Sequence, residues 1–357
     1  MTSVGASPRN DLGLVLIGRN EGERLRRALV ATRGQFAASV YVDSRSTDGS
    51  VELARSFGID VVELDLSVPF TAARARNAGF ERLVAAHPEV ALVQFVDGDC
   101  ELDPRWLDRG LLELERDPRL AVVAGRRRER HPDASVYNLL CDLEWDTPIG
   151  PGSDCGGDAL MRVEAFRAVG GFDPALIAGE EPDLCTRLRA RGLGVLRVDA
   201  EMTLHDAAMT RFGQWWKRAV RTGYTAAESW ARQGSSIGAR HRRHVFSALF
   251  FGACVPIAIL GLLALPASIA PWTPRLVAVG VLASGYGVIF LQILAARKRH
   301  GDPPRARRVY ATFCLLGKLP ELEGIVRYVL NRVRGRRARW IEYKDVPARP
   351  GGSARPS

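Results

Sequence analysis

The chain has 357 residues, 46% of them hydrophobic and 25% charged, so it can form one large or two smaller domains and is not wholly disordered. Residues 297–357 hold 16 Lys and Arg against 5 Asp and Glu, a net charge of +11, while residues 1–296 hold 34 against 35, a net of −1. Because the basic excess is confined to the C-terminal segment, the sequence argues against a globally basic nucleic-acid-binding protein.

The six cysteines form no CxxC pair and no His/Cys cluster with zinc spacing. Free thiols of this kind fit a reducing compartment. Residues 1–11 are expected to be a disordered tail, and they lack the apolar region of a cleavable signal peptide. We therefore expect the segment that precedes the first membrane-type helix to stay in the cytoplasm.

Residues 12–230 alternate between strand and helix patterns. Strands are predicted over residues 12–18, 39–44, 59–64 and 91–99, with helices over 21–32, from 47 onward and over 73–87. Repeated β-α units predict an α/β domain with a mainly parallel sheet and helices on both faces. Ligands of such sheets bind beyond the carboxyl ends of the strands, where the polar residues of this sequence gather. No GxGxxG motif follows a predicted strand, which disfavours a dinucleotide site.

Two apolar runs, residues 245–265 and 276–296, are each long enough to cross a bilayer as a helix. A basic connector, 231–244, precedes the first run and ends in RHRRH, and RKRH follows the second. The positive-inside rule then places both flanks in the cytoplasm and the proline-containing loop between the runs on the other side. The alternative is a buried helical hairpin of a soluble domain.

Residues 297–345 form a basic segment in which apolar residues recur at helical spacing from Ile325 to Val333, with arginines between them. This pattern predicts a helix in the membrane interface, with its arginines near anionic headgroups. A helix packed on the rest of the protein is the alternative. Residues 346–357 are expected to be disordered.

Asp97-Gly98-Asp99 ends an apolar strand, where two carboxylates need a cation or hydroxyl groups to offset their desolvation. Carboxylate oxygens suit Mg²⁺ or Mn²⁺ bound to a diphosphate. A D-x-D motif alone is weak, because it also occurs in solvated turns.

The motifs LIGRNEG, VDSRSTDGS, ARNAG, VDGD, GGD and GEEPDL follow one another in an order that resembles the family 2 glycosyltransferases. The resemblance covers about residues 12–225. It implies a GT-A fold, a nucleotide-sugar donor, a divalent metal and inversion at the anomeric carbon.

The resemblance also implies roles for individual residues. It implies that the donor is bound by six residues, namely Asn20, Glu21, Asp43, Arg76, Asn77 and Asp97. For the metal it implies Asp99 and Asp97, with His205 as a further ligand. The alternatives are a turn or cap role for Asp43 and a structural role for His205.

The resemblance implies that the acceptor or the donor sugar is contacted by Gly157 and Asp158 and by the aromatic pair Trp215 and Trp216. Asp158 could also cap a helix that starts at residue 159, a role compatible with ligand contact. The two tryptophans could instead belong to an amphipathic helix on the membrane.

In GEEPDL, Glu181 matches the position of the catalytic base, with Glu180 and Asp183 as the alternatives. An inverting reaction needs a carboxylate that removes the acceptor proton while the acceptor oxygen attacks the face opposite the leaving diphosphate.

Together these features predict a membrane-anchored inverting glycosyltransferase with its active site at the cytoplasmic face of a bacterial cell membrane. The acceptor would be lipid-linked or a cell-envelope glycan. Two alternatives remain: a subunit of a processive polysaccharide synthase, and a non-catalytic nucleotide-binding scaffold on the same fold.

Overall fold

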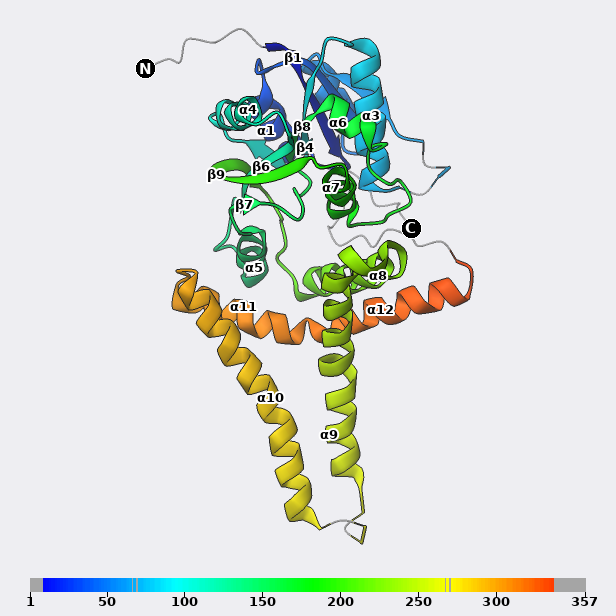
Figure 1. Ribbon diagram of the computed structural model, residues 1–357, viewed down its shortest axis with the longest axis vertical. Helices are drawn as coiled ribbons and strands as arrows, with labels where there is room; N and C mark the ends of the chain where they lie inside the picture. Colours follow the sequence, from blue (N-terminus) through cyan, green and yellow to red (C-terminus); the bar gives the residue numbers. More distant parts are fainter. Residues whose placement is uncertain (1–8, 66, 69, 267, 270, 337–357) are drawn as a thin grey trace, which may run out of the picture. The chain divides into compact units, whose positions relative to one another are not determined.

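The computed structural model describes residues 9–65, 67–68, 70–266, 268–269 and 271–336. It divides into two compact units (Figure 1). Among the described residues, unit 1 comprises 9–130 and 144–208, and unit 2 comprises 131–143 and 209–336. The predicted tail over 346–357 lies outside the described residues.

Unit 1 is built on one sheet of nine strands. The strands are β1 (Arg9–Gly18), β2 (Phe36–Asp43), β3 (Asp60–Glu63), β4 (Leu92–Asp97), β5 (Cys100–Leu102), β6 (Leu120–Glu129), β7 (Gly150–Pro151), β8 (Ala159–Arg162) and β9 (Gly194–His205). The buried stretches of β1, β2 and β4 are nearly continuous apolar runs, as expected for strands covered on both faces.

The strand order is β3-β2-β1-β4-β8-β6-β9-β5, and β7 pairs with β9. The first four strands are parallel, as the β-α repeats predict. The sheet then becomes mixed, because β8 runs antiparallel to both β4 and β6, and β5 runs antiparallel to β9. The α/β fold class is therefore confirmed.

The helices of unit 1 are α1 (Glu23–Thr32), α2 (Ser50–Ser56), α3 (Ala72–Ala86), α4 (Trp106–Arg116), α6 (Val163–Ala168) and α7 (Glu180–Ala190). Helix α3 packs closely on the sheet at Gly79, where an added Cβ would lie 2.5 Å from a methyl of Val15. This close packing fixes the position of Arg76, one turn earlier in the same helix.

Strand β1 begins at Arg9, earlier than predicted. Arg9 pairs with Phe36 of β2 and forms ion pairs with Asp11 and Glu115. Residues 9–11, which the sequence placed in a disordered tail, therefore belong to the sheet. Residues 1–8 lie outside the described part of the chain.

Unit 2 is helical. It contains most of α5 (Val136–Trp145), and α8 (Phe212–Leu249), the π-helical turn η1 (Phe250–Cys254), α9 (Val255–Ala264), α10 (Trp272–Arg299), α11 (Pro304–Leu316) and α12 (Lys318–Val333). The predicted connector over 231–244 is not a separate segment, because helix α8 runs through it without a break.

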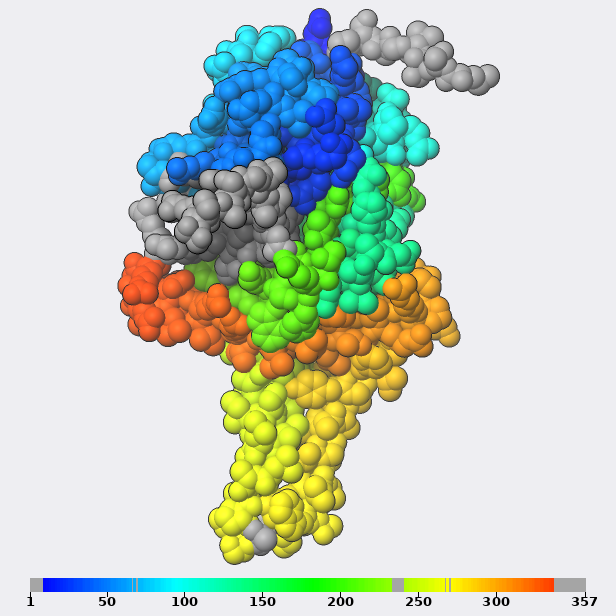
Figure 2. Space-filling view, turned by 180° about the vertical axis from the view of Figure 1, so that it is seen from behind, coloured from blue at the N-terminus to red at the C-terminus, as the bar shows by residue number. Residues whose placement is uncertain are grey.

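Two helices of unit 2 are long and apolar enough to cross a membrane, His241–Ala264 and Trp272–Arg299. They overlap both predicted spans. Figure 2 shows α9 and α10, coloured yellow, extending away from the orange α11 and α12 of the same unit. None of the most apolar window of the second helix is buried, which disfavours the alternative of a buried hairpin.

Helix α12 packs against α8 through two glycines. A Cβ at Gly223 would lie 2.0 Å from the carbonyl oxygen of Glu321, and one at Gly324 would lie 2.0 Å from that of Val220. The predicted helix from 320 onward thus has one face packed on the protein. Its other face leaves apolar side chains exposed, among them Val326, Val329, Leu330 and Val333.

We predict that Gly324→Ala lowers the thermal stability of the detergent-solubilised full chain. The added methyl group meets backbone atoms, which cannot rotate away, so an overpacking cost of about 1–3 kcal/mol is expected. Gly213→Ala in α8 is the control, because a Cβ there meets nothing within 4 Å. Equal melting temperatures for the two variants would contradict the close helix contact.

Candidate active site

The polar residues that follow β1, β2 and β4 lie side by side, as predicted. In the parallel register, Gly18 pairs with Asp43 and Ile17 pairs with Asp97. The N–H of Gly98 also donates to the carbonyl oxygen of Ile17 at 2.8 Å. The carboxyl ends of three neighbouring strands therefore bring Asp43 and the Asp97–Asp99 turn to one edge of the sheet.

Asp43 is buried and organises the turn after β2. Its carboxylate accepts hydrogen bonds from the backbone N–H and the hydroxyl of Ser46, at 2.7 and 2.5 Å. Asn20 supports the same turn, because its side-chain oxygen accepts the N–H of Thr47 at 2.7 Å. Glu21 lies next to this turn and pairs with Arg24 at 2.9 Å. The turn role considered for Asp43 is thus present, and its contact with a donor base stays a prediction.

Asp97 lies at the centre of a buried network of acids and arginines. One carboxylate oxygen pairs with Arg76 of α3 at 2.8 Å, and the other pairs with Arg127 of β6 at 3.1 Å. Burial alone would raise the pKa of Asp97, but the two guanidinium groups hold it well below its usual value. Asp97 is therefore a permanent anion that two cations hold in place.

Asp158 extends the network toward β8 and β9. Its side chain pairs with Arg127 at 2.7 Å and accepts the hydroxyl of Thr203 at 2.6 Å and the backbone N–H of Asp97 at 2.9 Å. Asp158 precedes strand β8, not a helix, so the helix-cap alternative is wrong. Its polar contacts orient Arg127 and Asp97.

Gly157 permits this network to form. A Cβ at this residue would lie 2.5 Å from Nη2 of Arg76 and 2.8 Å from Oδ2 of Asp97. The sequence predicted that a glycine here allows a close approach to a ligand. In the structure the close approach is to the Arg76–Asp97 ion pair.

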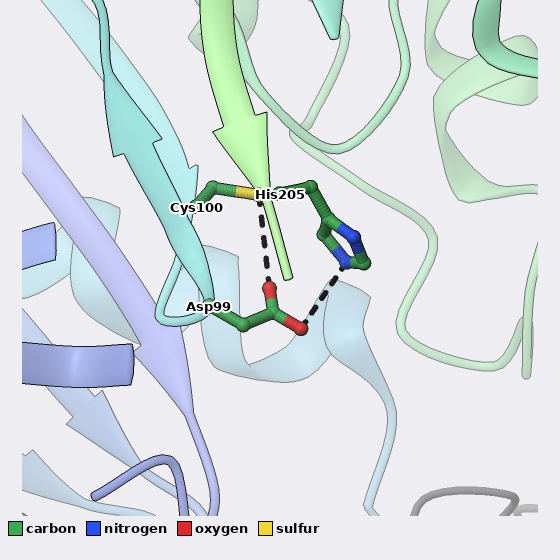
Figure 3. A group of neighbouring side chains, drawn as sticks. All are labelled: Asp99, Cys100 and His205. Carbon is green, nitrogen blue, oxygen red and sulfur yellow. Dashed lines mark hydrogen bonds and ion pairs between the residues drawn. The ribbon is translucent and has the colours of Figure 1, made fainter. Parts of the chain in front are cut away.

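Asp99 and His205 form a second, adjacent cluster. Asp99 is buried, and its Oδ2 lies 3.2 Å from Nε2 of His205, with Cys100 beside it (Figure 3). Strand pairing places Cys100 opposite His205 across β5 and β9. The rings of Trp145 and His205 pack in a T-shaped arrangement, with their centroids 4.5 Å apart.

The described residues include two groups of side chains that could bind a metal ion. The chemistry of their ligand atoms distinguishes the two groups. The first is Asp99, Cys100 and His205, and the second is Asp97, Cys100 and Asp158. Arg127 already neutralises the second group at 2.7–3.1 Å. The buried carboxylate and imidazole of the first group fit a divalent cation such as Mn²⁺. Of the three predicted metal ligands, Asp99 and His205 are brought together, whereas Asp97 is held by the arginines.

The predicted catalytic carboxylates begin helix α7. Glu180 is buried and pairs with Arg76 at 2.8 Å, while Asp183 pairs with Arg187 of its own helix at 2.8 Å. Glu181 lies farther from Arg76, at 3.5 Å, and is more exposed than Glu180. Burial raises the pKa of Glu181, and the charge of Glu180 raises it further, although Arg76 opposes both effects. Of the three, Glu181 has the environment of a general base.

Comparisons with known proteins identify the domain that carries this site. Residues 14–169 match the family described as Glycosyl transferase family 2. Residues 14–169 are therefore a glycosyltransferase family 2 domain.

Two curated relatives are themselves glycosyltransferases. Glycosyltransferase AglE of Haloferax volcanii is 25% identical over 224 residues, which are 59% of this chain and 71% of that protein. The pre-mycofactocin glycosyltransferase of Mycobacterium tuberculosis is 30% identical over 233 residues, or 61% of this chain. The match spans 47% of that second protein.

Among solved structures, the chain is similar in fold to the mannosyltransferase PcManGT from Pyrobaculum calidifontis, solved in complex with GDP-Man and Mn²⁺. The TM-score is 0.60 at 16% identity, and the match covers 92% of this chain and 90% of that one. At this identity the likeness shows the GT-A fold.

Three residues that sequence analysis placed at the donor or acceptor have other partners in this glycosyltransferase. The amide of Asn77 bonds to the backbone of Phe172, donating at 2.8 Å and accepting at 3.0 Å, so it holds the loop before α7. Trp215 is buried against Phe313 within unit 2. The indole N–H of Trp216 donates to Glu323 of α12 at 2.8 Å. These contacts give all three residues structural roles.

Sequence analysis missed Arg127 and Glu129. Both lie in the run RRRER at the end of β6, and residues two apart in a strand point to the same face. The period of two places both side chains on one face of β6, but it does not say which face is buried, so the sequence carries no signal that singles them out. In the structure each meets an oppositely charged or polar partner.

We predict that kcat/KM rises with pH through a pKa above that of an ordinary glutamate. Only deprotonated Glu181 accepts a proton, and its raised pKa keeps it protonated to higher pH. Glu180→Gln removes the adjacent negative charge, so the acidic limb of the profile should move to lower pH. In Asp183→Asn the limb should move less, because Arg187 already pairs with Asp183. An unmoved limb in Glu180→Gln would contradict Glu181 as the base.

Proposed function

We propose that this family 2 glycosyltransferase is anchored in a membrane and transfers a sugar, with inversion, from a nucleotide-sugar donor to a lipid-linked or envelope-glycan acceptor. The observation that carries the proposal is the placement of Glu181. This carboxylate with a raised pKa lies 3.5 Å from Arg76, which joins it to Asp97 at the strand ends.

Inversion follows from the chemistry of a single base. The acceptor hydroxyl loses its proton to Glu181 as its oxygen forms a bond to the anomeric carbon. The bond from that carbon to the diphosphate breaks on the opposite face. Arg76 pairs with both Glu181 and Asp97, so it would hold the base in place relative to the strand ends.

Asp99 and His205 would hold the divalent cation, Mg²⁺ or Mn²⁺. When bound, the cation neutralises negative charge that develops on the leaving diphosphate. Asp43 and the turn that it shares with Asn20 and Ser46 would receive the base of the donor. The mannosyltransferase with the similar fold was solved with GDP-Man and Mn²⁺, which supports a donor of this class.

The two apolar helices support a membrane location. Their basic flanks favour a topology in which both ends of the hairpin face the cytoplasm. The outer face of α12 combines exposed Val326, Val329 and Val333 with exposed arginines, which suits anionic headgroups. An enzyme on the membrane surface favours a lipid-linked or membrane-proximal acceptor.

Two other functions are disfavoured by specific observations. A non-catalytic scaffold has no need for a base with a raised pKa, yet Glu181 has this property. A processive synthase threads its product through a channel, and two apolar helices, at His241–Ala264 and Trp272–Arg299, are few for lining one.

The test of the proposal is a thermal-shift screen of the full chain with UDP-, GDP- and dTDP-sugars in the presence of Mn²⁺, followed by transfer assays. A donor at 100 times its Kd should stabilise the protein by about 2.7 kcal/mol. The product should carry the opposite anomeric configuration to the donor. A retained configuration, or the absence of both stabilisation and transfer, would overturn the proposal.

Glu181→Gln should reduce turnover by about 10² to 10⁴, the usual contribution of a positioned base. Donor affinity should change little, because the proposed nucleotide contacts lie on β2 and its turn. Glu180→Gln is the matched control and should lose less activity. If Glu180→Gln is the inactive variant instead, the base is Glu180. Single-turnover kinetics and donor titrations separate these outcomes.

The topology prediction uses two cysteine variants in a chain whose exposed Cys254 is replaced by serine. Ser268→Cys, in the loop between the helices, should react with a membrane-impermeant maleimide added outside intact cells. Arg299→Cys, in the basic flank, should react only after lysis. Both positions are exposed, so access to the reagent depends on the membrane. The reverse labelling pattern would place the catalytic unit on the opposite side.

A further inference from the structure

A buried carboxylate lies behind the candidate metal ligand His205. The side chain of Glu129 has no exposed surface, and its Oε2 lies 3.6 Å from Nδ1 of His205. On the other side of the same ring, Nε2 faces Asp99 at 3.2 Å. The imidazole is therefore positioned between two buried acids, one at each ring nitrogen.

The sheet fixes this arrangement. Glu129 and His205 are register partners in the parallel pairing of β6 with β9. Oε2 of Glu129 also accepts the backbone N–H of Ala207 at 3.0 Å, which secures the chain directly after His205. The N–H of Arg130 donates to the carbonyl oxygen of His205 at 2.8 Å. Neither residue can shift without disturbing the other.

Imidazole chemistry then limits what Glu129 can do. A cation takes the lone pair of one ring nitrogen, and the ring proton must lie on the other. If the cation is shared by Nε2 and Asp99, the proton lies on Nδ1, and it faces the carboxylate of Glu129. Carboxylates in this position fix the orientation of a ligating histidine and increase its basicity.

We propose that Glu129 is a positioning residue for the metal site: it holds His205 with Nε2 directed toward Asp99 and so raises the affinity of this site for Mn²⁺. The inference rests on the proposed function, because that function assigns the cation to Asp99 and His205. It adds a residue that makes no direct contact with donor, acceptor or metal.

Two substitutions distinguish the effect of the charge of Glu129 on the metal site from the effect of its shape. Glu129→Gln keeps the size of the side chain and an oxygen for the N–H of Ala207, but it removes the charge that faces Nδ1. Glu129→Asp keeps the charge and shortens the side chain. A positioning role through charge predicts that Gln weakens the metal site more than Asp. A merely structural role predicts the reverse order, because Gln fits the buried space better.

The experiment measures binding of Mn²⁺ alone to the full detergent-solubilised chain, by electron paramagnetic resonance of the free ion. Glu129→Gln should weaken binding about 10- to 100-fold, the usual effect of removing such a partner. Glu201→Gln is the matched control: it makes the same chemical change on β9, at a side chain that is 43% exposed, and should leave the affinity unchanged. Melting temperatures without metal confirm that each variant is folded.

A double-mutant cycle with His205→Ala shows whether Glu129 acts through the histidine. In the His205→Ala background, adding Glu129→Gln should cause no further loss of Mn²⁺ affinity. An equal loss in both backgrounds, no loss from Glu129→Gln alone, or a greater loss from Asp than from Gln would each overturn the proposal. Because no sugar transfer is measured, this result is independent of whether the proposed transfer reaction is found.

Discussion

The buried chain of ion pairs from Glu180 through Arg76, Asp97 and Arg127 to Asp158 is the interaction on which unit 1 depends. It joins α7, α3, β4, β6 and the start of β8. Each charge costs several kcal/mol to remove from water, and its neighbours in the network offset this cost. Removing Arg76 would leave the buried Glu180 without the cation that it pairs with, at a cost of about 3–5 kcal/mol.

This network also divides the acids of the site into distinct roles. Asp97, between two guanidinium groups, keeps a low pKa and stays ionised. Glu181, at the end of the network, has its pKa raised by burial and by Glu180. Asp99 lies outside the network, beside an imidazole. Chemically identical carboxyl groups thus have different environments, and for this reason we propose one as an anchor, one as a base and one as a metal ligand.

Unit 2 depends on the close packing of its helices. Its long helices α8 and α12 approach each other through Gly223 and Gly324, where backbone meets backbone without intervening side chains. Trp216 fastens the same two helices through Glu323. The most apolar window of the first candidate span is only 22% buried and that of the second is not buried at all, which fits a lipid environment.

The sequence by itself determined the features that depend on local patterns: the parallel strands and the acids at their carboxyl ends, the two apolar helices, and the order of family motifs that contains Asp99 and Glu181. It did not determine the partners of those residues. Arg127 reaches Asp158, 31 positions away, and Asn77 reaches Phe172, 95 positions away. Only the tertiary structure decided that Arg127 and Glu129 face the site while Trp215 packs inside unit 2. Strand register and helix packing set these contacts, and neither leaves a periodic signal in the chain.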